Sequence, residues 1–139
     1  MQYAILYFTI LLPFCAMDAG WLTAMGPILY KPTLGDILLP ALKTGPAIAF
    51  YAFYPVGLMI FAALPALRSG GAMTAILYGA AFGAISYATY DLTNFATLRN
   101  WTLQITVLDI CWGAMASAAA ATVGYFLTRT ISGWPGAAS

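Results

Sequence analysis

The sequence contains no histidine and no glutamate, and only nine charged residues are spread over its 139 positions. Without histidine, the Ser–His arrangement of nucleophilic enzymes is excluded, and the usual zinc or haem site lacks its ligands. Five lysines and arginines against four aspartates give a net charge of +1, and no basic run is present to neutralise a phosphate backbone. We therefore expect no metal, no cofactor and no nucleic-acid partner.

Cysteine is also scarce. The two copies, Cys15 and Cys111, both lie in apolar runs, where a free thiol behaves as a small hydrophobic side chain. A disulfide framework is therefore not expected. Any chemistry must come from aspartate, tyrosine, asparagine, threonine, lysine and arginine.

Apolar residues dominate what remains. Hydrophobic residues make up 63% of the chain and charged residues 6%, against about 45–50% and about 25% in soluble domains. A small soluble domain exposes a large surface, and nine charged side chains cannot coat it. With a mean hydropathy of +0.87, the chain is predicted to be a membrane protein.

Four apolar runs are long enough to cross a bilayer, which takes about 20 residues. They cover residues 3–26, 47–67, 72–98 and 103–128. The runs are continuous rather than alternating, which favours helices over a transmembrane barrel. The predicted fold is all-α: an integral membrane four-helix bundle in one domain, 1–139, whose first run is a permanent span rather than a cleaved signal peptide.

The connections between these runs differ in length. Two are short, which makes their flanking spans antiparallel neighbours. In the long one, leucines at helical spacing over residues 33–43, with Thr33 as a possible N-cap, predict an interfacial segment. It is either a helical lid over the bundle mouth or an ordinary connector. Gly79 and Gly83 predict close helix packing, within the bundle or in a homo-oligomer.

Three aspartates, Asp18, Asp91 and Asp109, fall inside predicted spans. A charged residue at a helix centre costs about 2.5–3.5 kcal/mol on insertion scales, so these side chains must face the bundle interior or approach a membrane interface. Counting along antiparallel spans brings all three into the half of the bilayer near the first and third connections. We expect them to share one cavity.

Polar and aromatic residues occur at the same level. Helical spacing puts Tyr87, Asp91 and Asn94 on one face, and Arg99 follows in the next turn as the expected counter-charge. The candidate catalytic residues are Asp91, Asp18, Asp109 and Tyr90. The candidate ligand-binding residues are Tyr51, Tyr54, Tyr87, Asn94, Trp21, Trp112 and Arg99. The alternative interpretation is interhelical hydrogen bonding at about 0.6 kcal/mol each, with Trp101 and other aromatics in the interfacial belt.

Three motifs carry a family resemblance: Asp18-x-x-Trp21-Leu22, the stretch YATYDLTNFATL over residues 87–98, and Asp109-x-x-Trp112-Gly113. With them the chain resembles a bacterial family of small four-span inner-membrane proteins catalogued as a domain of unknown function. The resemblance implies four spans with both termini cytoplasmic, and hence an aspartate level toward the periplasmic half. It implies no activity.

Three functions fit this pattern. The first is binding or modification of a membrane lipid or lipid-like molecule, with proton transfer by a buried aspartic acid and Tyr90 or Tyr87 as donor. The second is a small proton- or cation-coupled transporter, since membrane acids often line ion pathways. The clustering of polar residues at one end disfavours it. The third is an accessory subunit of a larger membrane complex.

Overall fold

A computed structural model describes residues 1–135, and this part of the chain is helical with no strand. The elements are α1 (Gln2–Met25), the π-helical turn η1 (Gly26–Tyr30), α2 (Lys31–Leu34), the 3₁₀ turn η2 (Gly35–Ile37), α3 (Thr44–Leu58), the π-helical turns η3 (Met59–Ala63) and η4 (Ala66–Gly70), α4 (Gly71–Thr97) and α5 (Leu103–Ser132). The predicted all-α class is confirmed.

Three continuous helical segments are long and apolar enough to cross a membrane: Gln2–Ile37, Thr44–Thr97 and Leu103–Ser132. The predicted count of four separate helices is therefore not reproduced, because no non-helical residue stands between α3 and α4. A straight helix of 54 residues would be about 80 Å long. The segment instead folds back at Gly71, whose φ of 71° lies in a region that favours glycine.

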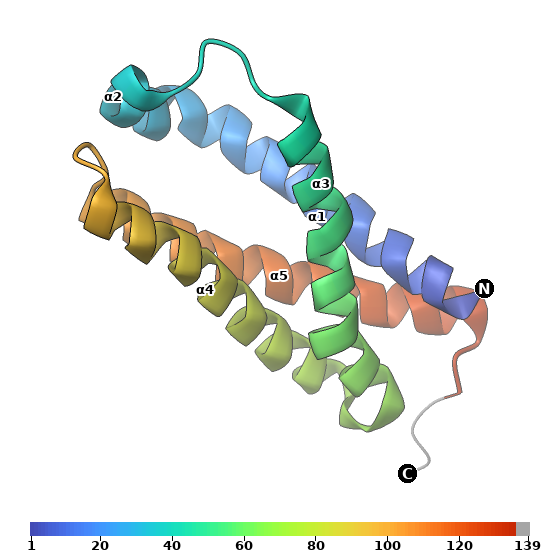
Figure 1. Cartoon of the computed structure of the whole chain (residues 1–139). Coiled ribbons are helices and arrows are strands. Elements are labelled where there is room, and N and C mark those ends of the chain that lie inside the picture. The colour runs from blue at the N-terminus through green and yellow to red at the C-terminus, as the bar shows by residue number, and fades with distance from the viewer. Residues whose placement is uncertain (136–139) are drawn as a thin grey trace.

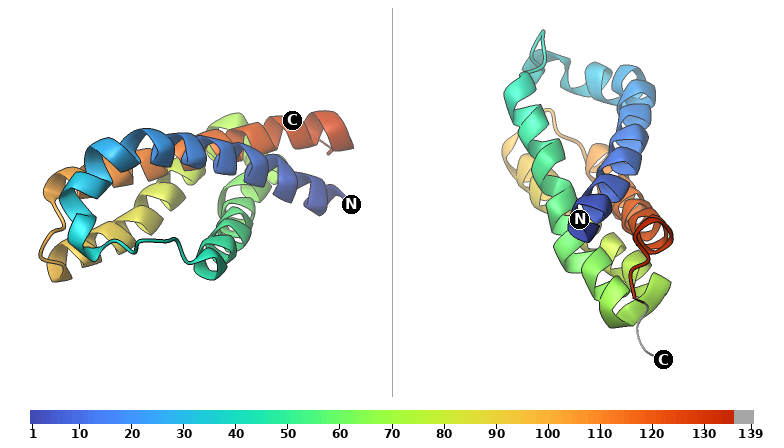
Figure 2. Two further views of the ribbon diagram at one scale, coloured as in Figure 1. Left: turned by 90° about the horizontal axis from the view of Figure 1, so that it is seen from above. Right: turned by 90° about the vertical axis from the view of Figure 1, so that its right-hand side faces the viewer.

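The helices share two ends, which Figure 1 places at left and right. The loop end holds the α1–α3 and α4–α5 connections, and the terminal end holds the N-terminus and the turn at Gly71. Helix α5 packs antiparallel against both α4 and α1, and Figure 2 shows α1 and α5 side by side in both views. Helices α3 and α4 meet at the terminal end and diverge toward the loop end.

Small residues let α4 and α5 approach closely. A Cβ on Gly83 would lie 2.1 Å from the carbonyl oxygen of Gly113, and one on Gly79 would lie 2.9 Å from Cα of Ala118. The Gly79-x-x-x-Gly83 pair therefore packs inside the molecule. Near the terminal end the main core is filled by large apolar side chains, among them Leu6, Ile10, Phe14 and Leu58, all with no exposed surface.

The π turns η1 and η3 each lie just ahead of a proline. The closing hydrogen bonds run from the N–H of Lys31 to Gly26 O, just before Pro32, and from Leu64 to Met59 O, just before Pro65. A proline ring crowds the carbonyl four residues earlier and cannot donate, and a wider turn relieves that crowding. The first of these turns determines where Tyr30 points.

The long connection differs from the helix proposed over residues 33–43. Helical structure continues from α1 without a break and ends at Ile37, so Thr33 lies inside it and is not an N-cap. Leu38 is already extended, with φ −77° and ψ 139°. Pro40 explains the end, since it cannot donate to a helix and disfavours helical geometry in the residue before it. The segment 38–43 is a connector without helix.

Candidate functional site

A cavity of about 750 Å³ lies at the loop end, between α1, η1, α2, the connector, α4 and α5. Its polar and aromatic wall consists of Asp18, Trp21, Tyr30, Lys31, Tyr87, Tyr90, Asn94, Trp101, Asp109 and Trp112. Its apolar wall includes Leu34, Ile37, Leu38 and Leu42 from the α1–α3 connection. The connection therefore lines the cavity with aliphatic side chains both from its helical part, which ends at Ile37, and from the non-helical segment 38–43.

The Asp18 carboxylate joins three helices. It accepts a hydrogen bond from the hydroxyl of Tyr51 on α3 at 2.5 Å and another from Nε1 of Trp112 on α5 at 3.1 Å. Asp18 lies in the last third of α1 and is 6% exposed. Both of its oxygens thus have a donor, which a buried carboxylate requires.

The Asp109 carboxylate is bound from the α1 side of the cavity. The hydroxyl of Tyr30 donates to Asp109 Oδ1, and the same hydroxyl accepts a hydrogen bond from Trp21 Nε1 at 2.9 Å. Tyr30 reaches this position because it ends the π turn η1, whose extra residue rotates the side chains that follow.

The two indoles connect these carboxylates. Trp21 and Trp112 are stacked, with ring centroids 4.6 Å apart and planes 9° from parallel. The tryptophan of each Asp-x-x-Trp motif interacts with the aspartate of the other motif. Trp112 donates a hydrogen bond directly to Asp18, and Trp21 is linked to Asp109 through the hydroxyl of Tyr30. The repeated motif on two antiparallel helices therefore forms one interlocked network.

Asp91 lies deeper than the other two aspartates. It has no exposed surface, its carboxyl group neighbours that of Asp109, and it does not itself line the cavity. Within residues 1–135, neither of its oxygens has a hydrogen-bond partner. Its helix neighbours Tyr87 and Asn94 do line the cavity. The expected shared cavity therefore contains Asp18 and Asp109, with Asp91 buried against Asp109.

Three other predicted residues lie outside the cavity. Tyr54 is in the core, where its hydroxyl lies 2.8 Å from Ser117 Oγ and its ring stacks on Phe14 at 4.8 Å. Tyr51 touches the site only through its hydroxyl. Arg99 is exposed in the α4–α5 connection and is absent from the cavity wall, so its expected role as the counter-charge finds no support. The basic residue that does line the cavity is Lys31.

Sequence reasoning missed Tyr30 and underestimated Trp101. Tyr30 stands next to Lys31-Pro32, where a proline would be expected to end a helix, yet the helix continues through it. The proline after a continuing helix is a signal for the π turn that positions Tyr30. Trp101 was assigned to the interfacial belt, but it is 8% exposed and lines the cavity, and its indole N–H has no partner in the described chain.

A second hollow adjoins the first. It is an apolar crevice of about 410 Å³ between α3 and α4, lined by Phe50, Tyr54, Ser86, Tyr87 and Tyr90. Tyr87 and Tyr90 also line the main cavity. The two hollows therefore adjoin at Tyr87 and Tyr90, which line both of them. Helices α3 and α4, which form the crevice, diverge toward this end (Figure 1).

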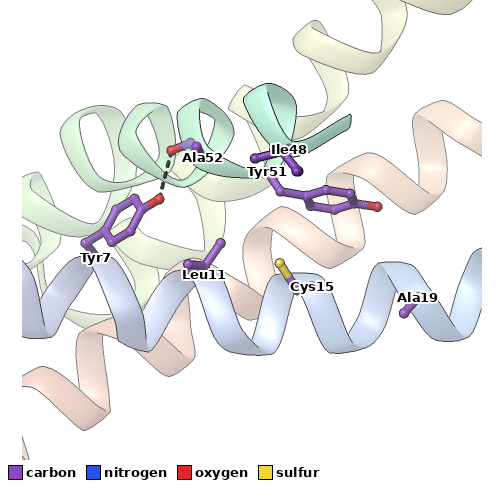
Figure 3. Close-up of a pocket in the computed structure, with 7 residues that line it drawn as sticks. All are labelled: Tyr7, Leu11, Cys15, Ala19, Ile48, Tyr51 and Ala52. Carbon is purple, nitrogen blue, oxygen red and sulfur yellow. Dashed lines mark hydrogen bonds between the residues drawn. The ribbon is translucent and has the colours of Figure 1, made fainter. Parts of the chain in front are cut away.

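A third hollow lies on the other side of α3. This groove of about 460 Å³ between α1 and α3 is shown in Figure 3, with Cys15 and Tyr51 on its wall. The hydroxyl of Tyr7 closes one side by donating to the carbonyl of Ala52 at 3.0 Å. Tyr51 thus forms a wall between the groove and Asp18. The other side chains that line the groove are mainly apolar and offer a ligand little more than packing contacts.

The described residues do not favour a metal centre. Within residues 1–135, no three histidine, cysteine, aspartate or glutamate side chains are grouped so that they could hold an ion. The acids instead use hydroxyl and indole donors. The arrangement is suited to hold a polar group of a ligand through hydrogen bonds and aromatic faces.

Comparison with known proteins identifies a family for the chain, but no individual relative. Neither the curated proteins nor the solved structures contain a significant match to this chain. A family model described as "Predicted membrane protein (DUF2177)" matches residues 3–126, which include all three aspartates and both Asp-x-x-Trp motifs. The chain therefore belongs to this membrane-protein family of unknown function.

Proposed function

We propose that the protein binds a lipid-like amphiphile, with the headgroup in the loop-end cavity and the hydrocarbon chain in the crevice between α3 and α4. The observation that carries the proposal is the junction of the two hollows. A polar, aromatic cavity meets an apolar crevice at Tyr87 and Tyr90. An amphiphile has the same two parts joined in the same order, and most ligand sites combine an apolar wall with a few placed polar groups.

The proposal includes four membrane crossings. Helix α1 has 24 residues, α4 has 27 and α5 has 30, and the helical stretch 44–70 is of similar length. Each is long enough for a hydrocarbon core of about 30 Å. The reversal at Gly71 supports two crossings in the middle segment. We further propose, as the family resemblance implies, a bacterial inner membrane with both termini cytoplasmic, so that the cavity opens toward the periplasmic side.

The hydrogen bonds favour binding over catalysis. Asp18 and Asp109 both accept hydrogen bonds from side chains of the bundle, and neither is bonded to Tyr90 or Tyr87, the proposed proton donors. The carboxylates instead position the aromatic side chains that form the cavity wall.

The test blocks the crevice and leaves the cavity intact. Ser86→Trp introduces an indole into the crevice wall, and Ala81→Trp introduces the same group at an exposed position on the same helix. Binding of a single-chain phospholipid to the purified protein is measured by native mass spectrometry. We expect Ser86→Trp to weaken binding about tenfold or more and Ala81→Trp to leave it unchanged. Equal binding by both variants would refute the proposal.

Asp91 favours a second candidate, a proton- or cation-coupled transporter. A proton or small cation between the adjacent Asp91 and Asp109 carboxyl groups would remove their mutual repulsion. The packed core with Phe14 and Leu58, however, lies between this pair and the terminal end. The test measures proton flux into proteoliposomes that contain either the unmodified protein or the Asp91→Asn variant. Loss of proton flux in the variant, with unchanged lipid binding, would favour transport.

A further inference from the structure

The cavity wall is unusually rich in aromatic side chains. Six of them come from both sides of the bundle and from both connections: Trp21, Tyr30, Tyr87, Tyr90, Trp101 and Trp112. The face of an aromatic ring attracts a cation, and rings of tryptophan and tyrosine around a site are a recurrent way to bind ammonium groups. The apolar aliphatic wall lies mainly on the connection, away from α5 and its stacked indole.

Carboxyl groups outnumber basic groups on the cavity wall. Asp18 and Asp109 line it, and Lys31 is the basic residue. The hydrogen bonds that Asp18 and Asp109 accept come from neutral tyrosine and tryptophan donors, so these bonds add no positive charge. Each carboxylate oxygen has a second lone pair with which it can accept from a ligand.

The basic residue on the wall can hold an acceptor of the ligand. Lys31 on the same wall would attract an anionic oxygen.

We propose that the headgroup bound here carries a positively charged nitrogen beside a phosphate, as in phosphatidylethanolamine or phosphatidylcholine. The ammonium group lies among the aromatic side chains and aspartates, and phosphate oxygens accept from Lys31. This inference rests on the proposed amphiphile site and specifies its ligand class. It takes account of the acids, the aromatic wall and the lysine together, whereas an anionic headgroup would face Asp18 and Asp109.

The experiment compares lipids that share their acyl chains and differ only in headgroup. Phosphatidylethanolamine, phosphatidylcholine, phosphatidylglycerol and diacylglycerol are each titrated into the purified protein in detergent, and bound lipid is counted by native mass spectrometry. We expect the two amine headgroups to bind about tenfold more tightly than the other two. Equal binding of all four, or preference for phosphatidylglycerol, overturns the inference and leaves the amphiphile site standing. Binding of none refutes the amphiphile site itself.

A charge-matched pair of variants locates the preference. Asp109→Asn removes a carboxylate from the cavity, whereas Asp36→Asn removes one from an exposed turn outside it. We expect Asp109→Asn to reduce the preference for amine headgroups to about threefold or less, and Asp36→Asn to leave it intact. An unchanged preference in Asp109→Asn would contradict the assignment. The lipid series on the unmodified protein needs no variant, so it decides the question even if Asp109→Asn does not fold.

Discussion

The hydroxyl of Tyr30 is the best place to test the network quantitatively, because one oxygen makes two of its bonds. It donates to Asp109 and accepts from Trp21 Nε1 at 2.9 Å. Tyr30→Phe removes that oxygen and leaves both partners unpaired, while the ring still fills its space. Each orphaned polar group costs about 1–3 kcal/mol. Tyr30 is itself only partly buried, so we expect a total of about 2–3 kcal/mol, or about 6–9 °C in Tm.

The assay is thermal unfolding in one detergent, with near-ultraviolet circular dichroism as a second signal. The dichroism reports the Trp21–Trp112 stack, which should loosen when Trp21 loses its acceptor. Tyr7→Phe is the matched control, because it removes a hydroxyl that makes a single bond at an exposed position, and should cost less than about 1 kcal/mol. If Tyr30→Phe were no more damaging than Tyr7→Phe, the network would contribute nothing to folding and the reasoning would be wrong.

Three further predictions, made on five variants, concern the packing and the charges. Gly83→Ala should lower stability by about 1–3 kcal/mol, because its Cβ would lie 2.1 Å from a backbone oxygen, whereas Gly20→Ala, with nothing within 4 Å, should stabilise by up to about 1 kcal/mol; thermal unfolding measures both. Arg99→Gln should leave phospholipid affinity unchanged and Lys31→Gln should weaken it about threefold or more, as native mass spectrometry would report; the reverse order would restore the arginine as the counter-charge. Asp91→Asn should keep or raise Tm, because neither carboxyl oxygen has a partner in residues 1–135, and a loss above about 5 °C would reveal an interaction that this conformation lacks.

The helices were predictable because a single physical requirement governs them. Backbone groups in a bilayer must be satisfied within the segment, so a long apolar run has to be helical. The reversal between α3 and α4 was also readable from Arg68-Ser69-Gly70-Gly71, since positive φ at Gly71 needs a glycine. What the runs do not show is that helical geometry continues through that turn, and through Lys31-Pro32 after α1.

The sequence predicts at which end of the bundle the site lies, but not which side chains pair within it. Counting residues along antiparallel helices places Asp18 and Asp109 at one end, and the i, i+3 spacing puts an indole beside each. Which indole serves which carboxylate depends on how α1 and α5 are rotated about their axes, which composition does not determine. Arg99 was misjudged for a related reason: the backbone after α4 becomes extended at Leu98, with ψ 128°, and the arginine that follows is exposed.

The pattern of satisfied and unsatisfied polar groups supports a ligand site at the loop end. Elsewhere the polar side chains of the helices are paired locally: the hydroxyls of Thr23, Thr89 and Thr122 donate to backbone carbonyls four residues earlier. Within residues 1–135, the buried side-chain atoms without a partner are the Asp91 oxygens and the Trp101 nitrogen. One lies behind a cavity carboxylate and the other on the cavity wall. A bilayer supplies no water to compensate such groups, so within residues 1–135 the polar groups that interhelical hydrogen bonds leave unsatisfied gather at the loop end, around the cavity.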